Sequence, residues 1–251
     1  MTRSGLIAVL IASFAASAAA QRGPARSATH VPADVLALVC APKAVYEMPA
    51  HPLRVTGGQD DVERRIYSPG DLVTINAGTD NGIEVGQEYF VRRVLGEYRR
   101  YTSRNVPGNI RTAGWIRIYA VDKEMSLATI TYACDTIEVG DYLEPLVLPV
   151  VPATQAEAPG PQHSNYAHIV FGTDRRRSVG KGEFFVIDHG SDHGVSVGSL
   201  FVVYHDKQLP GNFLYEVGEA VAVEVGPETS TLQVTLSRSA FGASDYVAIR
   251  K

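Results

Sequence analysis

Short runs of apolar and β-branched residues alternate with turns rich in glycine, asparagine and aspartate along most of this chain. Such runs lack the spacing of an amphipathic helix and are typical of strands. We therefore expect an all-β protein. The pattern predicts strands at 72–76, 89–94, 115–121 and 126–132, and again at 184–188, 200–205, 220–225 and 230–236.

The same pattern occurs twice. Gly70–Val91 (GDLVTINAGTDNGIEVGQEYFV) is matched without a gap by Gly182–Val203 (GEFFVIDHGSDHGVSVGSLFVV), at an offset of 112 residues. A second block, Ala113–Leu143, is matched by Val217–Val247 at an offset of 104. Shared glycine spacing indicates shared backbone positions that need positive φ or close approach. Since the offset falls from 112 to 104, the connection between the blocks is eight residues shorter in the second copy, and we expect it to be a loop.

The two copies divide the chain into domains. We expect two small β-barrels or sandwiches, at 53–146 and 166–251. Between them, residues 147–165 are rich in proline, which favours an extended, semi-rigid linker. Each copy is long enough to bury one small core.

The N-terminal residues 1–20 have the features of a secretory signal peptide. Arg3 precedes a short apolar run, and small residues lead to Ala20, after which we expect cleavage. The run is too short to cross a bilayer, and nothing later in the sequence predicts a membrane span. We therefore expect an exported protein, periplasmic or secreted. Residues 21–52 follow as an N-terminal leader, in which Val35–Cys40 fits a strand or one helical turn.

Cys40 and Cys134 are the two cysteines of the chain. In an oxidising envelope, a pair of cysteines suggests one disulfide. Two buried free thiols are the alternative, because spacing alone does not decide between them. A disulfide would connect the leader to the last strands of the first copy.

Composition and charge narrow the choice of partners. Hydrophobic residues make up 45% of the chain and charged residues 20%, as in ordinary globular proteins. The net charge of −4 argues against nucleic acid, whose binding domains are usually basic. Gly172–Lys181 (GTDRRRSVGK) departs from a phosphate loop both in its glycine spacing and in the residue after the lysine. We therefore expect neither a nucleic-acid partner nor a cofactor.

One cluster of acids and histidines stands out, at 188–193. Its members are Asp188, His189, Asp192 and His193. These residue types are common metal ligands, but the equivalent positions at 76–81 hold residues typical of a turn. We interpret the cluster as an exposed turn and expect no metal site. The common catalytic motifs are absent from the sequence, so we expect no enzyme, with a hydrolase built on two facing carboxylates as the less favoured alternative.

Basic and aromatic residues gather in the long connection of the first copy, which we expect at 94–112. Arginine and tyrosine are enriched at binding hot spots, and the shorter second copy shows that the extra length is unnecessary for the fold. A tolerated insertion is the alternative, because lengthening a surface loop costs little. Arg92–Arg93 adjoin this cluster, and Arg175–Arg177 form a second basic stretch. The predicted partner-binding residues are Tyr98, Arg99, Arg100, Tyr101 and Arg104.

Three motifs of the first copy are similar to those of a known family. They are GTDNGIEVG at 78–86, GWIRI at 114–118 and the closing IEVGDYLEP at 137–145. This series resembles the β-barrel repeat of bacterial envelope proteins, such as the C-terminal domain of the flagellar H-ring protein FlgT and the repeats that accompany LysM domains. The second copy departs from the pattern at its end, where the closing proline is missing.

The resemblance implies a non-catalytic module of the cell envelope. We expect a binding or assembly protein that acts through loops and strand edges on envelope proteins or on a cell-wall polymer. A protein specialised for peptidoglycan or another polysaccharide is the alternative.

Overall fold

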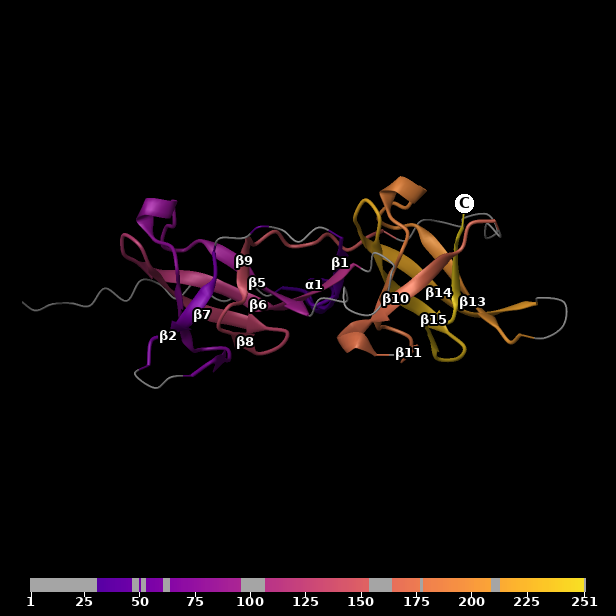
Figure 1. Cartoon of the computed structure of the whole chain (residues 1–251), viewed down its shortest axis with the longest axis horizontal. Coiled ribbons are helices and arrows are strands. Elements are labelled where there is room, and N and C mark those ends of the chain that lie inside the picture. The colour runs from indigo at the N-terminus through magenta and orange to yellow at the C-terminus, as the bar shows by residue number, and fades with distance from the viewer. Residues whose placement is uncertain are drawn as a thin grey trace, which may run out of the picture. The chain divides into compact units, whose positions relative to one another are not determined.

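The computed structural model describes residues 31–46, 50, 53–60, 64–95, 107–153, 164–176, 178–208 and 213–250. Strands dominate this part of the chain, so the predicted all-β class is confirmed (Figure 1). The region Val31–Lys251 forms one compact unit.

The first copy forms an antiparallel sheet in the strand order β2-β4-β7-β6-β5-β9. A bridge between Arg54 and Tyr142 joins the two ends of this path. A short pair, β3 (Ile66–Tyr67) with β8 (Ile137–Glu138), lies beside the sheet. The bounds of the main strands are β2 (Val55–Gly58), β4 (Leu72–Ile75), β5 (Glu88–Leu95), β6 (Gly108–Val121), β7 (Ser126–Ala133) and β9 (Tyr142–Pro145).

The second copy forms a closed barrel in the order β10-β12-β15-β14-β13-β17, which corresponds strand for strand to the first sheet. Its short extra pair is β11 (Ser178–Val179) with β16 (Phe241–Gly242). The bounds of the main strands are β10 (Ala167–Gly172), β12 (Phe184–Ile187), β13 (Leu200–Asp206), β14 (Leu214–Val225), β15 (Ser230–Ser237) and β17 (Tyr246–Ile249).

Equivalent short 3₁₀ turns follow β4 and β12. They are η1 (Thr79–Asn81) and η4 (Ser191–His193), and a third such turn, η3 (Thr173–Arg175), follows β10. Gly82 and Gly194 end the first two with φ of 76° and 79°. This left-handed conformation favours glycine, which explains why the same spacing is found in both copies.

Each copy has its own apolar core. In the first, inward-facing aliphatic residues from the main strands are buried together, among them Val73, Ile116 and Ile118. In the second, Phe185 and Phe241 meet edge to face at a centroid distance of 5.6 Å. The alternation of buried and exposed positions along the strands produces these cores.

The predicted leader contains regular structure. Helix α1 (Ala33–Val39) and strand β1 (Lys43–Val45) lie within it, so the stretch that fitted either a strand or a helical turn is helical. We call residues 31–46 the strap. The helix ends before Pro42, which has no N–H group with which to continue the helical hydrogen bonds. Strand β1 then pairs with β6.

The strap contacts both copies. Val39 is buried with Phe90 and Trp115 of the first copy. Leu38 and Ala41 are instead buried with residues of the second copy, Phe184, Val221 and Val223. Neighbouring residues of a short helix point to different sides, so α1 presents apolar side chains to both copies.

Candidate functional site

The predicted binding loop lies between β5 and β6. Strand β5 extends to Leu95 and β6 begins at Gly108, so the ends of the range expected as loop, 94–112, belong to strands. Cross-strand pairing continues from Arg92 with Thr112 as far as Leu95 with Asn109. The predicted residues Tyr98, Arg99, Arg100, Tyr101 and Arg104 lie outside the described residues.

Arg92 and Arg93, which adjoin this cluster in sequence, are strand residues with internal partners. Arg92 is buried, and its guanidinium pairs with Glu144 and with the Thr112 hydroxyl. Arg93 makes two 2.8 Å hydrogen bonds to the buried carboxylate of Asp141. Their role is therefore structural, because buried charges require such partners.

The hairpin β13–β14 is the equivalent of β5–β6 in the second copy. At its tip, where His205 and Asp206 pair with Tyr215 and Leu214, the two strands pair with no other described strand. This tip projects from the barrel (Figure 1). Phe213 and Tyr215 are exposed here, with relative residue exposures of 64% and 40%. The Lys207 ammonium lies 4.5 Å from the centre of the Tyr215 ring.

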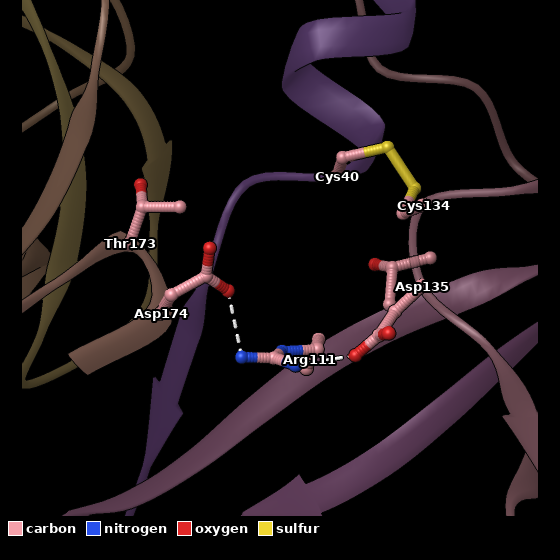
Figure 2. Close-up of a pocket in the computed structure, with 7 residues that line it drawn as sticks. Cys40, Arg111, Cys134, Asp135, Thr173 and Asp174 are labelled. Atoms are coloured by element: carbon pink, nitrogen blue, oxygen red, sulfur yellow. Dashed lines mark hydrogen bonds and ion pairs between the residues drawn. A yellow bond between two sulfur atoms is a disulfide. The ribbon is translucent and has the colours of Figure 1, made fainter. Parts of the chain in front are cut away.

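A disulfide joins Cys40, directly after α1, to Cys134, directly after β7. Their Cα atoms are 5.6 Å apart, and the bond spans 94 residues of sequence. Both cysteines are half-buried and line a cavity of about 360 Å³ together with charged and hydroxyl side chains (Figure 2). The other lining residues are Arg111, Thr112, Asp135, Thr173 and Asp174.

Arg111 connects the two copies across this cavity. Its guanidinium pairs with Asp135 of the first copy and, at 2.7 Å, with Asp174 of the second (Figure 2). Burial alone would raise the pKa of Asp135, but hydrogen bonds from the Thr136 amide and from Arg111 outweigh it, and the pKa is lowered. Asp174 has a φ of 54°, a left-handed conformation that aspartate tolerates better than most residues.

The acid and histidine cluster is held by internal hydrogen bonds. Asp188 contacts the rings of His189 and His168, and the His189 ring stacks on His193 at 4.2 Å. Burial alone would raise the pKa of Asp188, but hydrogen bonds from His189 and from the His168 amide lower it. In the part of the chain that the structure describes, no three such side chains are placed to hold a metal ion.

Sequence reasoning missed the ion pair between Arg111 and Asp174, which connects the two copies. Asp174 follows the last glycine of β10 just as Asp60 follows the last glycine of β2, yet Asp60 pairs locally with Arg64. The partner of Asp174 is set by a tertiary contact, which no local pattern in the sequence records.

Comparisons with known proteins add no identification. No protein-family model and no curated protein sequence matches the chain. Among the described residues, no helix has the length and apolar character that a membrane crossing requires.

Proposed function

We propose that this chain is an exported, non-catalytic envelope protein that binds or assembles with partners through the hairpins β5–β6 and β13–β14. One observation carries the proposal. Phe213 and Tyr215 are exposed beside Lys207, on the hairpin equivalent to the one that holds the predicted binding loop.

The chemistry of these hairpins supports binding. Large aromatic side chains left in water cost free energy that a partner can recover by covering them. Both hairpins combine aromatic and basic residues: Lys207, Phe213 and Tyr215 in the second, and Tyr98–Arg104 in the sequence of the first. Aromatic side chains and arginine are enriched in the centres of protein interfaces. A protein partner is therefore favoured.

Two further observations support an exported protein of the envelope. The first twenty residues have the pattern of a signal peptide. The Cys40–Cys134 disulfide suits an oxidising compartment, such as the periplasm or the exterior of the cell.

The proposal is tested with two hairpin variants of the mature chain. In the first, Tyr98, Arg99, Arg100 and Tyr101 are replaced by serine; in the second, Phe213→Ser is combined with Tyr215→Ser. The matched control combines Val85→Ser with Val197→Ser, which are exposed apolar residues at equivalent turns outside the hairpins, with exposures of 67% and 50%. Each protein is cross-linked in envelope extract, and the captured proteins are identified.

We expect both hairpin variants to melt at the same temperature as the parent and to lose partners that the control retains. Retention of the same partners by both hairpin variants would place the binding surface elsewhere. A parallel pull-down with purified peptidoglycan tests the alternative, since aromatic rings and cations can also bind anionic glycans. If the protein binds peptidoglycan and the hairpin variants do not, the ligand is a cell-wall polymer.

A further inference from the structure

The Cys40–Cys134 disulfide connects the strap to the first copy at a point next to the second copy. Cys40 is followed at once by Ala41, which is buried with Phe184 and Val221 of the second copy. The main-chain oxygens of Pro42 and Ala44 then accept hydrogen bonds from Thr231 and Thr229, over 2.7 and 2.9 Å. The disulfide therefore fixes the residue just before this contact to the first copy, next to the β1–β6 pairing that holds Lys43–Val45.

The disulfide borders a polar cavity. Both cysteines line the cavity of about 360 Å³, whose other lining residues are charged or carry hydroxyl groups (Figure 2). A water molecule occupies about 30 Å³ in the liquid, so this polar space has room for several. A small thiol can approach the sulfur atoms through such a space.

The remaining polar contacts across the junction are weaker constraints. Lys43 pairs with Glu224, and Arg111 pairs with Asp174, at positions where the side chains are partly exposed to solvent. Ion pairs in water contribute little because solvent and salt screen them. Without the disulfide, the strap would be held to the second copy by the Lys43–Glu224 pair, two hydroxyl hydrogen bonds and a small apolar contact. The β1–β6 pairing, the hydrogen bond from the Thr112 hydroxyl to the Val39 oxygen and the apolar contact of Val39 would still hold it to the first copy.

We propose that the Cys40–Cys134 disulfide is a redox-sensitive latch, and that its reduction by a dithiol loosens the strap on the first copy and thereby weakens its contact with the second barrel. A thiolate of the dithiol attacks one cystine sulfur, and the other leaves as a thiolate that takes up a proton. The second thiol of the reductant then displaces the first cysteine from the mixed disulfide. Two electrons and two protons pass to Cys40 and Cys134, and the dithiol becomes a cyclic disulfide.

The test uses the mature full-length protein with dithiothreitol as the reductant, under native conditions. Hydrogen exchange is followed by mass spectrometry at graded reductant concentrations, where the intact masses give the reduced fraction. We expect exchange at Ala41 and at residues 43–45 to rise by at least about tenfold on reduction. The buried amides of Ile116 and Leu232, in the two cores, should keep their protection.

The control combines Cys40→Ser with Cys134→Ser. This variant should show fast exchange of the strap without reductant and no response to dithiothreitol. If it fails to fold, the reduced wild-type protein still provides the comparison. Three results would overturn the proposal: a disulfide that resists dithiothreitol in the folded protein, a strap that stays protected after reduction, or an equal loss of protection in both cores.

Discussion

Gly78 lies against the main-chain oxygen of Asp122, so closely that a Cβ atom added to it would stand 2.1 Å from that oxygen. Gly190 has the equivalent relationship with Gly226, at 2.3 Å. In both places a backbone segment must move to accept any side chain. We expect Gly78→Ala and Gly190→Ala each to lower the free energy of unfolding by about 2–4 kcal/mol, measured by urea denaturation.

Gly180→Ala is the matched control. The nearest atom to its added Cβ would be a Glu183 carboxylate oxygen 4.0 Å away, and its φ lies outside the left-handed region. This variant should stay within about 0.5 kcal/mol of the parent. Equal effects of Gly78→Ala and Gly180→Ala would contradict the close backbone approach at Gly78.

Arg93 and His205 hold equivalent carboxylates in the two copies, but with different strength. Arg93 makes two hydrogen bonds to Asp141 and further bonds to Glu138 and the Thr136 oxygen. His205 contacts Asp245 through a single ring nitrogen.

We expect Arg93→Ala to destabilise the protein by about 2–4 kcal/mol, because it leaves a buried carboxylate without its cation. His205→Ala should cost less, since the His205 side chain is 43% exposed and water can replace part of its contact. Thermal melting of the two variants gives the comparison. A larger loss for His205→Ala would contradict the assigned roles.

Cys40 and Cys134 should be fully oxidised in the exported protein. Titration of the unreduced, unfolded chain should find no free thiol, whereas two titratable thiols would reject the disulfide. The chain-entropy model predicts that replacing both cysteines by serine costs about 2–5 kcal/mol, because the bond closes a long segment. Urea denaturation of the double variant measures this loss.

The free energy of unfolding should depend on the ionisation of Asp188 at acidic pH. Its pKa in the folded protein is lowered below the ordinary value of 3.8. Its contribution to stability is therefore complete above that value and is lost as the pH falls through the folded-state pKa. Between about pH 5 and pH 2, the free energy of unfolding should fall less steeply for Asp188→Asn than for the parent. Parallel slopes for both proteins would show that the hydrogen bonds to Asp188 do not favour its charged form.

Much of the strand framework could be predicted from local chemistry. Alternating apolar residues indicated the strands, and glycine spacing indicated turns such as those at Gly82 and Gly194. These features are readable because a left-handed residue or a buried strand face restricts the residue type at its own position. The boundaries of β5 and β6 were harder to predict from the sequence, because the length of a hairpin depends on how far its two strands remain paired.

The sequence by itself determined the all-β class, the two matched blocks and the residue types available for a partner. Only the tertiary structure decided that the predicted leader forms α1 and β1, that Cys40 approaches Cys134, and that Arg111 pairs with Asp174. A seven-residue helix is too short to be stable alone, so its contacts with both copies determine its conformation. Pairings between residues far apart in the chain depend on how the whole backbone folds, and no local pattern records them.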